Sequence, residues 1–284
     1  MKKSLSFKQL ILLHMRDAGM QLFKIHADRV KPHQDILQKI MASLERSEIT
    51  IEDNDILAVT SKVISLSQGR LVKLSKVKPS AEAVELSRRY NLDAEYVELI
   101  LREADKIYGG TDQALCTVKD GVMIANAGVD RKNVPSGYAV LFPKAPHKVA
   151  DTLRRKIHRM TGRFVGVIVV DSRVTPLRLG TVGVALGFAG FNPVLDCRGS
   201  KDLYGRPLQI TRHCRVDDLA GAAHLLMGET TERVIAVLIR GAPIKVSHNL
   251  TRPVRMDAAK VPPNRCLFIN ALSYVGKSPM VNVR

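Results

Sequence analysis

Aromatic residues are scarce in this sequence and tryptophan is absent: Phe, Trp and Tyr together make up 5% of the 284 residues. Proteins that bind single-stranded nucleic acid without sequence preference stack the bases on exposed aromatic rings. The composition provides little material for such stacking surfaces, and the chain contains no recognised nucleic-acid-binding motif.

Cysteine is also rare, and the few cysteines are isolated. Cys116, Cys197, Cys214 and Cys266 lie far apart, with no Cys-x-x-Cys pair. This spacing indicates neither a disulfide framework nor a structural zinc site. We therefore expect reduced thiols in a cytoplasmic protein.

The chain lacks a long apolar segment at its start. The opening residues MKKSLSFKQLILLH contain a short apolar patch, but His14, Arg16 and Asp17 interrupt it well before the length of a signal peptide or a membrane span. We expect a basic extension over residues 1–22 and no membrane association.

The common nucleotide-binding motifs are missing as well. The glycines between residues 180 and 190 do not have the G-x-G-x-x-G spacing of a dinucleotide site. Gly276-Lys277-Ser278 resembles the end of a P-loop, but Ala271 stands where that motif requires a glycine.

Positive charge, in contrast, is abundant. The chain has 44 Lys and Arg against 27 Asp and Glu, a formal net charge of +17, and its 45% hydrophobic content is sufficient for a globular core. A surface field of this sign attracts anionic partners. Nucleic acid, an acidic membrane and a phosphorylated small molecule all fit it.

Hydrophobic periodicity predicts a mixture of helices and strands. Ser80 and Asp93 are the predicted N-caps of two helices between residues 79 and 106. Further helices are expected over residues 36–44, 148–160 and 216–227, and strands over 56–59, 122–124, 164–170, 179–190 and 234–239. We expect the basic tail from residue 244 onward to be irregular.

The stretch from Asp120 to Pro135, DGVMIANAGVDRKNVP, is a candidate site. A short predicted strand leads into Asn126-Ala127-Gly128, where the near absence of side chains allows the backbone to approach a ligand closely. Asp130 then stands at the mouth of the site. The alternative is an ordinary polar turn after a strand.

A second carboxylate follows the most continuous apolar run in the chain. Phe164 to Val170 predicts a central strand buried on both faces, and we expect it to end at Asp171-Ser172. Magnesium binds a few carboxylates together with substrate phosphates. Asp130 and Asp171 are therefore candidate metal ligands, which favours a site over a turn.

Three other segments are candidates for binding an anion or a metal. Ser61 and Lys62 follow a predicted strand, and they either hold phosphate oxygens or form a solvated strand terminus. Glu229 is a third candidate metal ligand. The arginines in the loop over residues 196–207 either bind an anionic ligand or pair with the aspartates of the same loop.

Several of these segments occur together in one known family. Val59-Thr60-Ser61-Lys62, Asn126 to Asp130 with Asn133, Asp171-Ser172 with Pro176 and Arg178, and Asp202 to Arg206 resemble, in this order, motifs of the coenzyme F420 gamma-glutamyl ligase family. The resemblance covers roughly residues 23 to 243, with the basic tail 244–284 beyond it. It implies an α+β fold with antiparallel and mixed sheets and flanking helices, assembled as an intertwined homodimer.

The resemblance also implies an activity. The family uses GTP and a divalent metal, Mg²⁺ or Mn²⁺, to attach L-glutamate through a γ-linked amide to the deazaflavin precursor of coenzyme F420. The acceptor carboxylate is phosphorylated by GTP, and the glutamate amine then attacks the acyl phosphate. Position by position, the implied metal contacts are Asp130, Asp171, Ser172 and Glu229, and the implied GTP contacts are Ser61, Lys62, Asn133 and Glu229.

Two segments depart from the family pattern. The family reads Asp-Thr-Phe-Gly-Arg-Pro-Trp-Arg and then Gln-Thr-Asp, whereas this chain has DSRVTPLR from Asp171 to Arg178 and then Thr181-Val182-Gly183. Leu66 also stands where a nucleotide-contacting lysine is expected. A second hypothesis is therefore a paralogue with another acceptor or amine. A third, of a different class, is a non-catalytic protein that binds nucleic acid or another anion.

Overall fold

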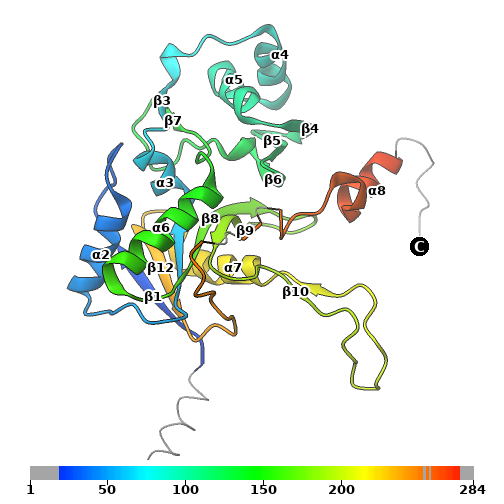
Figure 1. The fold of residues 1–284 in the computed structure, drawn as a ribbon. Coiled ribbons are helices and arrows are strands. Elements are labelled where there is room, and N and C mark those ends of the chain that lie inside the picture. The colour runs from blue at the N-terminus through cyan, green and yellow to red at the C-terminus, as the bar shows by residue number, and fades with distance from the viewer. Residues whose placement is uncertain (1–18, 252–253, 256, 276–284) are drawn as a thin grey trace, which may run out of the picture.

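The computed structural model describes residues 19–251, 254–255 and 257–275. It confirms an α+β architecture around a five-stranded mixed sheet (Figure 1). β2 and β8 are parallel, and the other neighbouring strands are antiparallel. The strand order is β1 (Gln21–His26), β12 (Val234–Arg240), β2 (Ile56–Thr60), β8 (Gly166–Val174) and β9 (Thr181–Ala189).

The alternation of side chains along these strands creates two apolar faces. Helices α2 (Ile36–Arg46) and α6 (Pro146–Thr161) cover one face, where they pack on residues such as Val59 and Val169. Helix α7 (Arg215–Met227) covers the other face and packs on residues such as Ile168 and Val170. The sheet is therefore the middle layer of the main body.

A smaller lobe stands beyond one end of the sheet, at the top of Figure 1. Its apolar cluster joins the helices to the antiparallel strands and to the 3-10 helix η2 (Asn126–Gly128). The elements of this lobe are α4 (Ala81–Tyr90), α5 (Ala94–Glu103), β4 (Lys106–Thr111), β5 (Ala114–Lys119) and β6 (Val122–Ala125).

A short connection joins this lobe to the main body. The chain leaves the main body through α3 (Ser61–Ser67), β3 (Leu71–Lys73) and the 3-10 helix η1 (Leu74–Lys76). It returns to the main body through β7 (Tyr138–Val140), which pairs with β3. The lobe is thus an insertion between β2 and α6. The loop that carries Asp130 lies on the return path.

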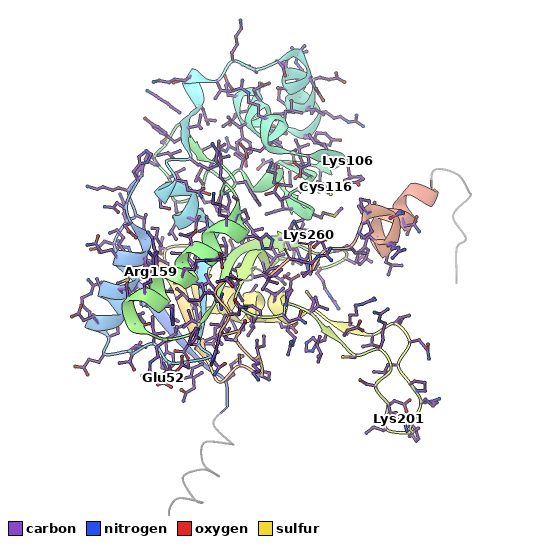
Figure 2. All side chains as sticks on the ribbon, in the orientation of Figure 1. Glu52, Lys106, Cys116, Arg159, Lys201 and Lys260 are labelled. Carbon is purple, nitrogen blue, oxygen red and sulfur yellow. The ribbon has the colours of Figure 1, made fainter. Side chains whose placement is uncertain are left out.

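A long hairpin projects from the body. Strands β10 (Leu195–Asp196) and β11 (Arg212–His213) pair at its base, and Figure 2 shows Lys201 near its far end. Leu203, Tyr204 and Ile210 on this hairpin are strongly exposed apolar side chains. Among the described residues, the Arg206 guanidinium lies 5.5 Å from the centroid of the Tyr204 ring, and the ring remains largely exposed.

The apolar core continues past residue 243. Ile244 and Val246 are buried on the α7 face of the sheet. Further along, Lys260 passes the turn at Gly121, where a Cβ would lie 3.1 Å from the Lys260 Cδ (Figure 2). The tail then forms the 3-10 helix η3 (Pro263–Arg265) and helix α8 (Leu267–Val275), so the expectation of an irregular tail was wrong there.

The predicted helices and strands are found at their expected places, and one of the two predicted caps is confirmed. The Ser80 side chain accepts a hydrogen bond from the Ala83 N–H at the start of α4. Asp93 occupies the N-cap position of α5 but accepts no capping hydrogen bond. Its carboxylate pairs with Arg131 instead, because the Asp130 loop lies beside this helix end.

One expectation about the candidate segments was wrong. Strand β8 does not end at Asp171 but continues to Val174, because β9 remains paired with it as far as Thr181. The small residues before Asp130 allow a close approach to the core, since a Cβ on Gly128 would lie 2.7 Å from the Phe142 Cδ2. The approach of a ligand to this backbone stays a prediction.

Some predictions concern segments outside the described residues. Residues 1–18 of the predicted basic extension belong to this group, whereas its last residues enter the sheet as the start of β1. The P-loop-like Gly276-Lys277-Ser278 also lies outside. Across the described segments, no helix is both long enough and apolar enough to cross a membrane.

Candidate functional site

Asp171 lies on β8 beside the start of α3. Because β8 and β2 are parallel, with Val170 level with Thr60, the chain turns into α3 next to the Asp171 side chain. Its carboxyl accepts hydrogen bonds from the Ser172 N–H, at 2.7 Å, and from the buried Ser61 side chain. Burial, reinforced by the charge of Asp130, raises the pKa of Asp171 to about 6 against the opposing effect of these bonds.

Asp130 lies on a loop, and contacts of Asp130 and its two neighbours hold that loop in place. The Tyr96 hydroxyl donates to the Val129 carbonyl at 2.6 Å, and burial raises the pKa of Tyr96 to about 12. Asp130 itself exchanges two backbone hydrogen bonds with Val140, at 2.9 and 2.8 Å. The Arg131 guanidinium lies 4.5 Å from the Tyr96 ring centroid and pairs with Asp93.

Lys62 pairs with Asp130 and lies near enough to Asp171 to influence its pKa. Thr60 caps α3 by accepting the Val63 N–H, which fixes the direction of the helix directly after β2. The Lys62 ammonium lies 2.6 Å from the Asp130 Oδ2, and its positive charge also lowers the pKa of Asp171. The structure therefore brings Ser61, Lys62, Asp130 and Asp171 together, which the sequence could suggest only through the family resemblance.

Ser172 contacts Asp171 through its backbone. Its neighbours Val169 and Val170 lie on opposite faces of the sheet. Strand alternation therefore points the Asp171 and Ser172 side chains to opposite faces as well. The Ser172 amide, not its hydroxyl, is the group bonded to the Asp171 carboxyl. A metal contact from the Ser172 hydroxyl stays a prediction.

Asn133 and Glu229 belong to a neighbouring contact between the lobe and the body. The Asn133 Nδ2 donates to the Thr230 carbonyl at 2.7 Å, and the Lys132 Nζ lies 3.4 Å from the Glu229 Oε2. Burial acts to raise the pKa of Glu229, but hydrogen bonds from Thr181 and His224 and the charge of Lys132 lower it to about 2. Glu229 is thus a carboxylate with several partners of its own.

Among the described residues, no third metal-binding side chain is grouped with Asp130 and Asp171. Across residues 19–251 and the described segments of the tail, no three His, Cys, Asp or Glu side chains are grouped closely enough to hold a metal ion. A metal at Asp130 and Asp171 would depend on other oxygens, such as those of a bound phosphate. Glu229 as a ligand of the same metal stays a prediction.

The donor set itself fits a hard divalent cation. Asp130 and Asp171 supply carboxylate oxygens, and the only ammonium paired with Asp130 in the described residues is Lys62. The charge of Asp130 raises the pKa of Asp171, which means that the two negative charges repel each other. A divalent cation would relieve that repulsion, and Mg²⁺ and Mn²⁺ both prefer oxygen ligands.

The departures from the family pattern have visible consequences. Leu66 is buried in α3, so its side chain faces the protein interior and not a nucleotide. Arg173 lies 3.4 Å from Asp217 on α7, and its buried Nε has no hydrogen-bond partner within the described residues. Leu177 and Leu179, further along the same loop, are fully exposed.

In the loop over residues 196–207, the arginines pair with aspartates of the same loop, as the second of the two interpretations expected. Arg198 pairs with Asp196 at 2.6 Å, and Arg206 pairs with Asp202 at 3.1 Å. The loop's own aspartates therefore occupy these arginines.

Sequence reasoning missed three groups that shape the site: Tyr96, Thr181 and His224. Tyr96 was hidden among the apolar residues of a predicted helix, and its role depends on a hydroxyl that reaches another segment. Thr181 and His224 meet Glu229 from β9 and α7. The close spacing of His224 and Glu229 across the helix-ending Gly228 was the one local signal of such a contact.

Comparison with known proteins places the chain in a family. The sequence model described as F420-0:gamma-glutamyl ligase matches residues 24–241. The chain is 41% identical over 214 residues to the coenzyme F420:L-glutamate ligase of Methanopyrus kandleri, covering 75% of this chain and 83% of the relative. It is 37% identical over 227 residues to the enzyme of that name from Archaeoglobus fulgidus, covering 80% of this chain and 91% of the relative.

A further relative leads to the same assignment. The coenzyme F420:L-glutamate ligase of Methanothermobacter thermautotrophicus is 39% identical over 210 residues, covering 74% of this chain and 83% of the relative. The matched residues include all of the sheet except the first residues of β1, the inserted lobe, and both candidate aspartates. The chain belongs to the F420-0:gamma-glutamyl ligase family.

Proposed function

We propose that this chain is a ligase that joins L-glutamate by a γ-linked amide to the deazaflavin precursor of coenzyme F420, using GTP and Mg²⁺ or Mn²⁺. The observation that carries the proposal is the meeting of Asp130 and Asp171 around Lys62, at the junction of the inserted lobe and the sheet. Two carboxylates and an ammonium at one point are suited to a metal-bound nucleotide phosphate. Family membership supplies the reaction class.

In the proposed reaction, the acceptor carboxylate attacks the γ-phosphorus of GTP, and the bond to the leaving GDP oxygen breaks. The glutamate amine then attacks the acyl carbon, loses a proton, and releases inorganic phosphate. Asp130 and Asp171 would hold the metal, whose charge would stabilise the transferred phosphoryl group. Ser61, Lys62, Asn133 and Glu229 would bind and orient the nucleotide.

A coupled assay of GTP conversion to GDP, run with and without glutamate and the F420 precursor, tests this proposal. We expect GDP formation to require both substrates, and mass spectrometry to find a product heavier by one glutamate residue. A folded chain with no turnover under these conditions would contradict the proposal.

A paralogue with a different acceptor or amine is the second candidate, and the segment from Arg173 to Gly183, which includes the β8–β9 turn, favours it. Arg173 is engaged with Asp217 in a segment where the family carries a glycine–arginine pair, an aromatic residue and an acid. Screening phosphorylated acids and amines by mass shift separates the two candidates. Salt-sensitive binding of nucleic acid that survives Asp130→Asn and Asp171→Asn would instead support the non-catalytic alternative.

We also propose that the chain forms a homodimer. The projecting hairpin carries Leu203, Tyr204 and Ile210 with most of their surface exposed, and apolar surface of this kind is typical of an interface. Sedimentation equilibrium of the wild-type chain and of Leu203→Glu tests this proposal. We expect a dimer that the charged substitution weakens; a wild-type monomer at all concentrations would contradict it.

A further inference from the structure

The Glu229 carboxylate receives two hydrogen bonds from the main body. The Thr181 hydroxyl on β9 donates to the Glu229 Oε1 at 2.6 Å, and the His224 Nε2 on α7 lies 2.9 Å from the same oxygen. Because an ionised carboxylate only accepts hydrogen bonds, the Nε2 carries the proton in this contact. The His224 side chain is 15% exposed, so the contact is largely shielded from water.

Close packing of α7 on β9 places His224 there. A Cβ on Gly183 would lie 2.3 Å from the Ala220 carbonyl oxygen and 2.7 Å from the His224 Cβ. The helix can therefore lie directly on the strand only where the strand has a glycine. Gly228, at a φ of +70°, then ends α7 and turns the chain so that Glu229 comes back to His224.

The second oxygen of Glu229 faces the inserted lobe. The Lys132 Nζ lies 3.4 Å from the Glu229 Oε2. The Lys132 backbone is part of the candidate site: its N–H donates to the Asp130 Oδ1 at 2.8 Å, and its carbonyl accepts from the Lys62 Nζ at 3.0 Å. Through Lys132, Glu229 is thus connected to the carboxylate of Asp130.

We propose that His224 is a positioning residue: together with Thr181 it aims Glu229 at Lys132, and so it fixes the Asp130 loop next to Asp171. The four side chains Thr181, His224, Glu229 and Lys132 form what we term the Glu229 bridge between body and lobe. His224 touches neither aspartate and acts only through this bridge. The inference deepens the proposed function and rests on it for the metal-binding measurement below.

The chain contains a matched control for His224. His213, on β11, lies 2.5 Å from the Asp218 carboxylate through its Nε2, and both pairs are separated by five residues at opposite ends of α7. Within the described residues, the His213 pair forms no hydrogen bond or ion pair with the Asp130 loop, and it is more exposed. Removing either imidazole deletes one histidine–carboxylate contact, but only His224 belongs to the Glu229 bridge.

The experiment compares His224→Ala, His224→Gln and His213→Ala by amide hydrogen exchange in the full chain without ligand. We expect exchange of the Lys132 amide to become about tenfold faster in His224→Ala, to return most of the way in His224→Gln, which keeps a donor, and to stay at the wild-type rate in His213→Ala. Mn²⁺ titration should show about a tenfold higher Kd for His224→Ala, the size of effect that follows loss of an outer-shell group supporting a metal site.

Two outcomes overturn the inference. One is a Lys132 amide that exchanges in His224→Ala as it does in His213→Ala. The other is faster exchange throughout the chain in both His224 variants, which would mark a general structural role. If the wild-type chain binds no Mn²⁺, the proposed function fails, while the exchange experiment still decides the role of His224.

Discussion

Asp171 and Asp130 carry the same side chain in two different regions of the molecule, and the regions treat that charge differently. Asp171 projects from a strand of the main sheet, where burial raises its pKa to about 6. Asp130 lies on a loop of the inserted lobe, where the Lys62 ammonium is 2.6 Å away. The sheet thus supplies a carboxyl that resists ionisation, and the lobe supplies one whose charge is already compensated.

This difference indicates how the site is assembled. Burying a charge is costly unless a partner compensates it. A buried carboxylate that lowers the stability of the fold, held on a rigid strand, is typical of a residue that serves binding and not stability. A loop held by Tyr96 and Arg131 brings the second carboxylate from another part of the fold.

Replacing either aspartate by asparagine should have the largest effect on activity. We expect Asp130→Asn and Asp171→Asn each to lower turnover about a thousandfold, because each removes a charged carboxylate that we propose as a metal ligand. Asp120→Asn, at a turn of the same lobe, is the control and should retain turnover. Near-normal GTP-dependent ligation by Asp171→Asn would show that the strand carboxylate is not required.

The same two variants should differ in stability. A pKa raised from 3.8 means that Asp171 stabilises the fold fully below about pH 4 and loses this contribution as the pH rises through about 6. At pH 7 the neutral Asp171→Asn should therefore raise the free energy of unfolding by about 1–3 kcal/mol. Asp130→Asn should lower it by up to about 1 kcal/mol, since it removes a partly exposed ion pair.

Urea denaturation of both variants at pH 7 and pH 4.5 measures this difference. The gain from Asp171→Asn should shrink at the lower pH, where the wild-type carboxyl is largely protonated. Equal destabilisation by the two substitutions would remove the contrast between strand and loop.

Metal affinity should depend on pH through Asp171. If Asp171 binds the metal as we propose, the metal competes with a proton at a group with a pKa of about 6. The Mn²⁺ Kd should then be constant above about pH 7 and rise about tenfold per pH unit well below pH 6. Titrations between pH 5 and pH 8 measure this dependence. A Kd without any pH dependence in this range would show that Asp171 does not bind the metal as a carboxylate.

Removing the Lys62 ammonium should have a smaller effect on activity. Lys62→Met keeps a side chain of similar length, and we expect it to raise the KM for GTP about tenfold through loss of a charge-assisted phosphate contact. Lys144→Met serves as the control, because Lys144 is exposed and the described residues show no ion pair between it and either aspartate. An unchanged KM for GTP would show that Lys62 pairs with Asp130 but does not bind the nucleotide.

The smallest effect should follow from loosening the Asp130 loop. Tyr96→Phe keeps the ring beside Arg131 but removes the hydroxyl that donates to the Val129 carbonyl. We expect the free energy of unfolding to fall by about 1 kcal/mol and the Mn²⁺ Kd to rise about threefold. Urea denaturation and Mn²⁺ titration measure these changes; a Kd equal to that of the wild type would separate loop anchoring from metal binding.

The regular elements were largely predictable from the sequence, because helical and strand periodicity are local. Ile36 to Leu44 and the apolar run to Val170 gave a helix and a buried strand directly. The continuation of β8 beyond Asp171 was not predictable in this way. It depends on pairing with β9, and the polar residues after Val170 look like a turn when the partner strand is unknown.

The candidate site was predictable only in part. Residue type and position suggested Asp130 and Asp171, but their proximity depends on the insertion of a whole lobe between β2 and α6. The contacts of His224 with Glu229 and of Tyr96 with Val129 depend on packing between segments. The close packing of Gly183 against α7 likewise depends on a contact between segments far apart in the sequence.

A crystal structure of the chain with GTP and Mn²⁺ tests the central claim most directly. The account predicts an anomalous manganese peak between the carboxylates of Asp130 and Asp171, with phosphate oxygens of the nucleotide completing the coordination. A nucleotide-bound manganese that contacts neither aspartate, while Lys62 remains paired with Asp130, would contradict it.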